Sequence, residues 1–143
     1  MTDPPAPDEP GPSDGQAPPA PGSVDRNRVR HVQQHELDAA ERMADLSYHV
    51  VFLPCSPGQG RRTPDWLVNG RTWELKSPTG AGAATIIQML RRAQCPRVVI
   101  DTCRTQLTMM DALTQVDVAF RRYPRLEAVL LIDEAGAYGR RRE

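Results

Sequence analysis

Apolar residues recur at three- and four-residue steps in three stretches of the chain, which predicts helices over residues 24–47, 83–94 and 107–123. Five shorter runs are rich in Val, Ile, Leu and aromatic residues. They predict strands over residues 48–54, 65–68, 71–77, 97–101 and 126–133. Prolines at positions 54, 96 and 124 mark element ends. The predicted order is helix, three strands, helix, strand, helix, strand.

This order predicts the fold class. Antiparallel strands come first and helix–strand alternation follows, which favours an α/β fold with a mixed (α+β) sheet and helices packed on its faces. We expect one domain over residues 25–135, followed by a basic, flexible tail over residues 136–143.

The first 24 residues differ in composition from the rest. They contain eight of the fourteen prolines, four acidic residues and no Lys or Arg, which predicts a disordered leader over residues 1–24. This leader lacks the basic and apolar segments of a signal peptide, and no apolar run is long enough to span a membrane. We therefore expect no membrane partner and a cytoplasmic location, with export by a specialised secretion system left open.

Charge and local geometry single out one hairpin. Asn69-Gly70 separates two strand-like runs and is a preferred type I′ two-residue turn. With these turn residues, Trp66 pairs with Trp73, and Asp65 is expected opposite Glu74. Lys76, two residues further on, shares the face of Glu74 because side chains alternate along a strand.

Lys76 is the only lysine in a chain with seventeen arginines. Two facing carboxylates repel each other, and a divalent cation between them removes that cost. Oxygen ligands on adjacent strands suit Mg²⁺ or Mn²⁺, and a nearby ammonium can orient or deprotonate a bound water. The alternative is an ordinary hairpin with a solvent-facing Glu74–Lys76 pair.

These residues resemble the PD-(D/E)xK nuclease superfamily, with Pro64-Asp65 followed by Glu74-Leu75-Lys76 inside an αβββαβ core that carries one additional helix and strand. More narrowly, residues 30–101 resemble the C-terminal tRNA nuclease domain of CdiA-type contact-dependent growth inhibition toxins. The resemblance implies that Asp65, Glu74 and the Leu75 carbonyl bind the metal, and that Lys76 acts on the attacking water.

The resemblance also implies a further acidic residue from the first helix. The candidates are Glu36, which we favour as a catalytic residue, Asp38 and Glu41. Gln94 resembles a glutamine that some superfamily members carry behind the site. Substrate contacts are expected from Gln94, from the loop that begins at Ser77 and Thr79, and from the pair Arg91 and Arg92.

The resulting hypothesis is a metal-dependent endonuclease of toxin type that hydrolyses RNA, with tRNA as the expected substrate. The alternatives are a DNA endonuclease of a restriction or mobile-element system, and a catalytically silent nucleic-acid-binding module. Without the leader the chain has 18 basic and 14 acidic residues, a net charge of +4. If the protein is a toxin, this charge predicts a small acidic immunity partner.

Overall fold

The structure is a computed structural model that describes residues 21–27, 29, 31–54 and 65–142. Ten elements follow one another in this part of the chain: β1 (Ser23–Asp25), α1 (Gln34–Asp45), β2 (His49–Phe52), β3 (Trp66–Val68), β4 (Arg71–Lys76), α2 (Thr85–Arg92), β5 (Arg97–Asp101), α3 (Met109–Arg122), β6 (Ala128–Asp133) and β7 (Gly136–Arg141). Within these ranges, none of the three helices has the length and apolar character needed to cross a bilayer.

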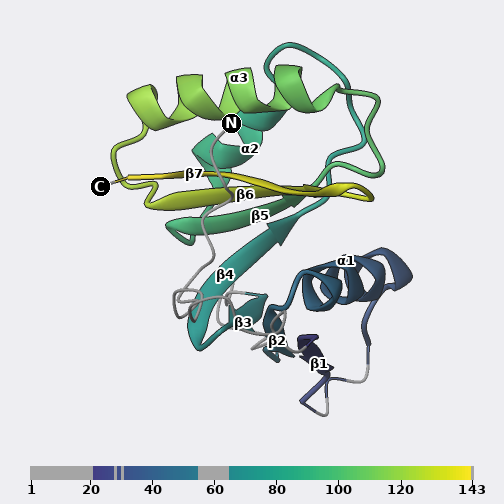
Figure 1. Cartoon of the computed structure of the whole chain (residues 1–143). Coiled ribbons are helices and arrows are strands. Elements are labelled where there is room, and N and C mark those ends of the chain that lie inside the picture. Colours follow the sequence, from purple (N-terminus) through teal and green to yellow (C-terminus); the bar gives the residue numbers. More distant parts are fainter. Residues whose placement is uncertain (1–20, 28, 30, 55–64, 143) are drawn as a thin grey trace, which may run out of the picture.

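The seven strands form one mixed sheet in which the spatial order equals the chain order. The strands β1 and β2 are parallel, β2–β3–β4 are antiparallel, β4–β5–β6 are parallel, and β7 is antiparallel to β6. The sheet twists strongly, and β4 links its two halves (Figure 1). The predicted mixed α/β class is confirmed.

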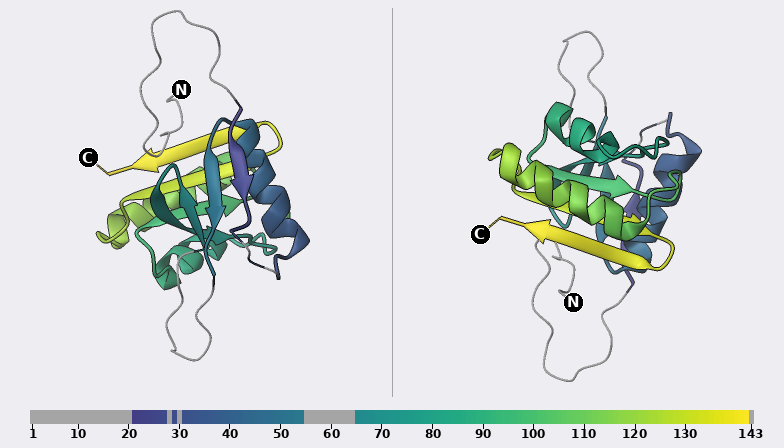
Figure 2. Two further views of the ribbon diagram at one scale, coloured as in Figure 1. Left: turned by 90° about the horizontal axis from the view of Figure 1, so that it is seen from below. Right: turned by 90° about the horizontal axis from the view of Figure 1, so that it is seen from above.

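Helices cover both faces of the sheet. The crossover helices α2 and α3 lie on one face of the parallel part, as expected when neighbouring β-α-β units share one handedness (Figure 2). Their apolar side packs on Val98, Ile100 and Leu131. Helix α1 lies on the opposite face, where Ala39, Ala40 and Met43 are fully buried against the half of the sheet that contains both tryptophans.

The beginning of the chain corrects one prediction. A helix was expected over residues 24–47, but α1 begins at Gln34 and Ser23–Asp25 form the short strand β1 instead. The strand forms because the outer edge of β2 accepts it, with Ser23 opposite His49. Gly22 enters this edge so closely that a Cβ would lie 1.8 Å from the Tyr48 carbonyl oxygen.

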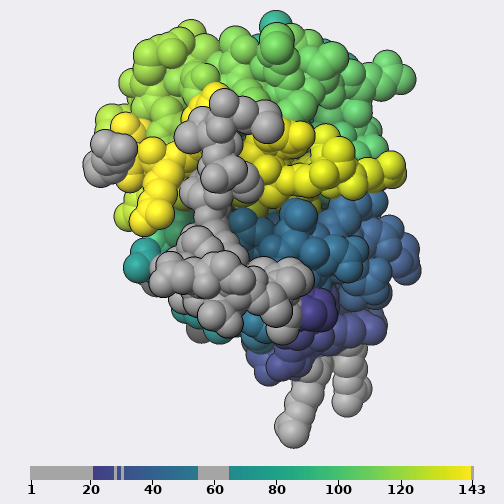
Figure 3. All heavy atoms as spheres, in the orientation of Figure 1, coloured from purple at the N-terminus to yellow at the C-terminus, as the bar shows by residue number. Residues whose placement is uncertain are grey.

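The end of the chain corrects a second prediction. Residues 136–143 were expected to form a flexible tail, but Gly136–Arg141 form β7 along the whole length of β6. In Figure 3, β7 (yellow) covers the sheet edge between α3 and α1. The predicted leader lies outside the described residues for positions 1–20, and β1 begins within its last two residues.

Candidate functional site

The hairpin predicted from the sequence is present. Asn69 and Gly70 have φ values of 47° and 89°, as a type I′ turn requires. The ladder pairs Val68 with Arg71 and Trp66 with Trp73, which confirms the predicted register. Both tryptophans are buried in the core below α1, so the opposite face of β4 is left to polar residues.

The candidate site lies where β4 changes partners. Its first half pairs with β3 up to Trp73, and its second half pairs with β5 from Glu74 onward. Asp65 stands one residue before β3 and therefore just beyond the last β3–β4 pair. The sheet separates at this point, and Asp65, Glu74 and Lys76 are brought together there.

Glu74 is buried, with 5% of its surface exposed. Its Oε1 atom accepts hydrogen bonds from the backbone N–H groups of Gln94 (2.8 Å) and Cys95 (3.1 Å), and its Oε2 atom lies 2.7 Å from Lys76 Nζ. Burial raises the pKa of Glu74, but the Lys76 ammonium and the two N–H groups together outweigh it, so the net pKa is lowered. Glu74 is therefore held as a carboxylate in a fixed position.

The pKa of Asp65 is shifted in the opposite direction to that of Glu74. Its Oδ2 atom accepts the backbone N–H of Leu75 at 2.8 Å. Burial raises the pKa of Asp65, and the negative charges of Glu74 and Glu36 raise it further, against the lowering effects of the Leu75 hydrogen bond and of Lys76. The folded protein therefore disfavours the charged form of Asp65, mainly through burial and further through the two neighbouring carboxylates.

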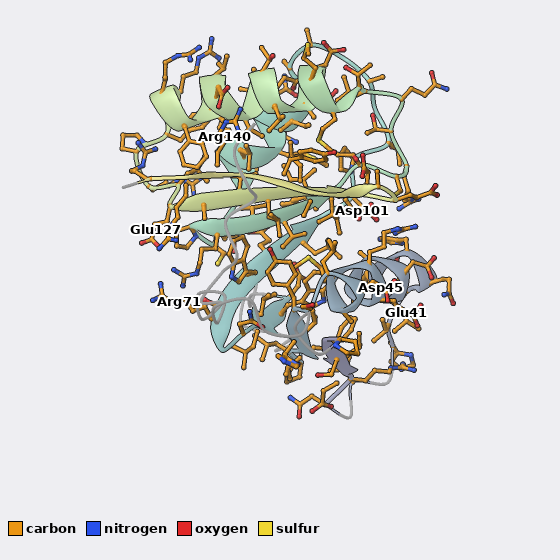
Figure 4. The ribbon with its side chains drawn as sticks, in the orientation of Figure 1. Glu41, Asp45, Arg71, Asp101, Glu127 and Arg140 are labelled. Atoms are coloured by element: carbon orange, nitrogen blue, oxygen red, sulfur yellow. The ribbon has the colours of Figure 1, made fainter. Side chains whose placement is uncertain are left out.

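The three acidic candidates of the first helix have different surroundings. Glu36, in the first turn of α1, is close enough to Asp65 to raise its pKa. Asp38 accepts a hydrogen bond from Gln34 Nε2 on its own helix at 2.8 Å, and Glu41 is exposed on the same helix (Figure 4). Of the three, Glu36 is the one whose charge acts on the site.

The surroundings of Asp65 and Glu74 decide whether the site could bind a metal ion. Among the described residues, no group of three or more His, Cys, Asp or Glu side chains is close enough to hold a metal by itself. Mg²⁺ needs only one or two carboxylates, because it keeps several waters and takes up substrate phosphate oxygens. Two neighbouring carboxylates supply hard oxygen donors and fit that requirement, so Asp65 and Glu74 are compatible with Mg²⁺.

The predicted substrate contacts lie around this site in different ways. Ser77 follows Lys76, and its buried Oγ atom has no hydrogen-bond partner among the described residues. Thr79 is exposed in the next loop, and Arg91 and Arg92 are exposed in the last turn of α2. The side chain of Gln94 is exposed, and it is its backbone N–H that contacts Glu74.

Two supporting residues escaped the sequence analysis. Gln115 of α3 is buried and fastens the loop before α2, because its Nε2 donates to the Gly82 carbonyl at 3.0 Å and its Oε1 accepts the Ile86 N–H at 2.8 Å. Thr105 Oγ1 donates to the Gly80 carbonyl and so ties the loop after β5 to the loop after β4. A buried glutamine on an otherwise apolar helix face was the available signal for Gln115.

Comparison with known proteins identifies the family. The sequence model of the family described as "Contact-dependent growth inhibition CdiA C-terminal domain" matches residues 61–137, which is more than half of the chain. The chain belongs to the CdiA C-terminal domain family. The match includes the hairpin, β4, α2, β5, α3 and β6, and therefore spans all the candidate residues except those of α1.

The comparison with solved structures agrees with this family. A CdiA-CT/CdiI toxin and immunity complex from Burkholderia pseudomallei contains a chain similar to this one, with a TM-score of 0.66 and 18% sequence identity. The alignment covers 85% of this chain and 100% of the other. At this identity the similarity establishes a shared fold. Comparison with curated protein sequences gave no match.

Proposed function

We propose that this chain is the toxin domain of a contact-dependent growth inhibition system and a metal-dependent endonuclease that hydrolyses phosphodiester bonds in RNA. The observation that carries the proposal is the convergence of Asp65, Glu74 and Lys76 at the point where β4 passes from β3 to β5. The choice of tRNA as substrate rests on the sequence resemblance of residues 30–101 to tRNA nuclease domains.

Asp65 and Glu74 would hold Mg²⁺, with Glu36 near enough to complete the negative charge around it. When bound, Mg²⁺ supplies a polarised phosphate oxygen and a water of lowered pKa. Lys76 has three N–H donors, of which one faces Glu74, so the others can orient the attacking water or donate to the phosphate. The main-chain N–H groups of Gln94 and Cys95 hold Glu74 in place through this step.

The conservative substitution Lys76→Arg tests this role. Guanidinium is longer and planar and does not give up its proton, so it cannot replace a compact ammonium beside Glu74. We expect Mg²⁺-dependent RNA cleavage to fall at least 100-fold, in the range of a lost acid–base group. The melting temperature should change little, because positive charge is kept next to Glu74.

The assay compares total tRNA, mRNA and plasmid DNA, each with Mg²⁺ and with EDTA. Arg104→Lys makes the reverse exchange at an exposed position after β5 and should leave cleavage unchanged. Cleavage of plasmid DNA alone would favour the DNA endonuclease alternative. Full activity of the folded Lys76→Arg variant would contradict the proposed mechanism.

An immunity partner is the second part of the proposal. The similar chain from Burkholderia pseudomallei was solved as a toxin and immunity complex. The net charge of +4 outside the first 24 residues favours an acidic partner for this chain. Copurification with the product of an adjacent gene and inhibition of cleavage by it would support this part. A protein that inhibits without binding this chain would contradict it.

A further inference from the structure

The arginines are unevenly distributed over the fold. Strands β4, β5 and β6 are parallel, so they begin at one end of the sheet, and α2 and α3 return the chain to that same end. The last residues of β7 lie there too, because Arg141 pairs with Ala128 at the start of β6. Ten of the seventeen arginines lie at this end, which we call the arginine end: Arg71, Arg91, Arg92, Arg97, Arg121, Arg122, Arg125, Arg140, Arg141 and Arg142.

Acidic side chains are gathered toward the other end. Figure 4 shows Arg71 on the left of the molecule, where Glu127 is the labelled acid, whereas Glu41, Asp45 and Asp101 lie on the right. Asp133 closes β6 at the carboxyl end of the parallel strands, where Asp101 closes β5. The fold therefore separates charge along the direction of its parallel strands.

Ion pairs use only part of the positive charge at the arginine end. Glu127 lies 2.6 Å from the Arg97 guanidinium, and Asp117 lies 2.8 Å from that of Arg140. Each of these two acids thus has its own arginine.

Two further arginines of this end cap the C-termini of helices. Arg125 donates to the carbonyl oxygens of Ala93, Leu90 and Arg91 at the end of α2. Arg142 donates to the carbonyl oxygens of Phe120 and Tyr123 at the end of α3. The partial negative charge of both helix C-termini is therefore already matched, and further arginines there are not needed to offset the helix dipoles.

Arg71 also has an interaction partner. Five arginines remain: Arg91, Arg92, Arg121, Arg122 and Arg141. All five are exposed, and their side chains make no ion pair or hydrogen bond with another described residue. Their mutual repulsion is unfavourable unless a polyanion binds. Arg125, which follows α3, donates to the Arg91 carbonyl at the end of α2. Arg142, which follows β7, donates to the Phe120 carbonyl in the last turn of α3. The ends of α2, α3 and β7 therefore lie side by side and present this charge as one surface.

We propose that the arginine end is a docking surface for the sugar–phosphate backbone of the nucleic acid substrate. The surface adjoins the candidate site, because Arg92 is two residues from Gln94, whose N–H contacts Glu74. Guanidinium groups bind phosphate oxygens in pairs and without reading bases. This proposal rests on the proposed nuclease function, and it adds that a long, folded substrate is gripped beyond the scissile bond.

The test measures binding without cleavage. Fluorescence anisotropy of labelled tRNA is followed in EDTA over a series of salt concentrations, with wild type and the double variant Arg121→Gln/Arg122→Gln. Loss of two phosphate contacts should lower the slope of log K against log salt by about 1.4–1.8 and weaken binding roughly 10-fold or more near 0.1 M salt. Arg104→Gln removes an exposed charge at the other end of β5 and should change neither value.

Thermal melting checks that the double variant is folded. If it does not fold, Arg141→Gln is the second variant, with an expected decrease in slope of about 0.7–0.9. An unchanged slope in a folded variant overturns the proposal. So does a variant that keeps tRNA binding but loses binding of poly-glutamate, which would assign the surface to an acidic protein.

The outcome is separable from that of the nuclease proposal. Arginine-dependent tRNA binding without any Mg²⁺-dependent cleavage would support the docking surface and reject the enzyme. Cleavage that depends on Lys76, with a salt slope that is the same in wild type and double variant, would support the enzyme and reject the docking surface.

Discussion

At the scale of single residues, Asp65 carries a charge that the metal-free fold disfavours. Its pKa is raised above the ordinary 3.8 mainly by burial. A carboxyl whose folded-state pKa is raised lowers stability above that pKa, and the loss disappears as the pH falls toward the ordinary value. In EDTA at pH 7.5, Asp65→Asn should therefore raise the melting temperature by a few degrees, whereas near pH 3.5 the difference should vanish.

With Mg²⁺ present, the wild type should have a higher melting temperature than Asp65→Asn. The ion binds the folded wild type and stabilises it by mass action, but it loses a ligand in the Asp65→Asn variant. Asp25→Asn is the matched control, because Asp25 is exposed and, like Asp65, accepts a backbone N–H that an Asn can also accept. If Asp65→Asn and Asp25→Asn have the same melting temperatures with EDTA and with Mg²⁺, Asp65 is not a metal ligand.

The residues of the site were predictable to different degrees. Asn-Gly fixed the register of the hairpin, so the proximity of Glu74 and Lys76 to Asp65 followed from local geometry alone. The contacts of Gln94 and Cys95 with Glu74 were not predictable, because every residue has the same main-chain N–H and the side chains carry no signal of it. The metal and the catalytic roles remain predictions.

At the scale of elements, α2 depends on a side chain of another helix. Its N-cap residue, Ala84, has no side chain that can cap, and Gln115 of α3 accepts the N–H groups of Ile86 and Ile87 instead. Gln115→Leu leaves these buried donors without an acceptor. We expect the free energy of unfolding to fall by about 1–3 kcal/mol, measured by urea denaturation.

Hydrogen exchange separates this effect from a general loss of packing. The Ile86 amide should lose protection in Gln115→Leu before the amides of β5 do. Gln88→Leu makes the same chemical change at an exposed position of α2 and should stay within about 0.5 kcal/mol of wild type. Equal stability of the two variants would show that Gln115 does not cap α2.

Elements with a strong local pattern were predicted well, and edge elements were not. The strand expected over residues 97–101 is β5, residue for residue, because a continuous apolar run between parallel neighbours is buried on both faces. The three-residue strand β1 has no such pattern and exists because β2 offers an open edge. Apolar residues at 24, 29 and 32 pack on the core without a helix between them.

At the scale of the whole molecule, the C-terminal segment shows why composition misled. Two glycines and three arginines after residue 135 are typical of a flexible tail. In the fold, β6 is a six-residue buried strand whose outer edge would be open, and β7 covers that edge from Asp133 back to Ala128. The partners that hold β7 come from β6 and, through the Asp117–Arg140 pair, from α3, and they are therefore invisible in the sequence of the segment itself.

The contacts of Arg142 make the attachment of β7 to α3 testable. Its guanidinium donates to the carbonyl oxygens of Leu126 (2.8 Å), Phe120 (2.8 Å) and Tyr123 (3.3 Å), and it lies 5.0 Å from the centre of the Phe120 ring. It thus replaces the missing hydrogen bonds at the end of α3 and fixes β7 to that helix at the same time. Arg142→Gln should lower the free energy of unfolding by about 1–2 kcal/mol, since charged hydrogen bonds at a partly exposed site are lost.

Arg141→Gln is the neighbouring control, and the pair separates two uses of arginine at one end of the molecule. Arg141 is exposed, and its side chain makes no ion pair or hydrogen bond with the described residues, so its loss should change stability by less than about 0.5 kcal/mol. The same variant should lower the salt dependence of tRNA binding, because its charge is available to phosphate. If Arg142→Gln is as stable as Arg141→Gln, then Arg142 does not hold β7 to α3.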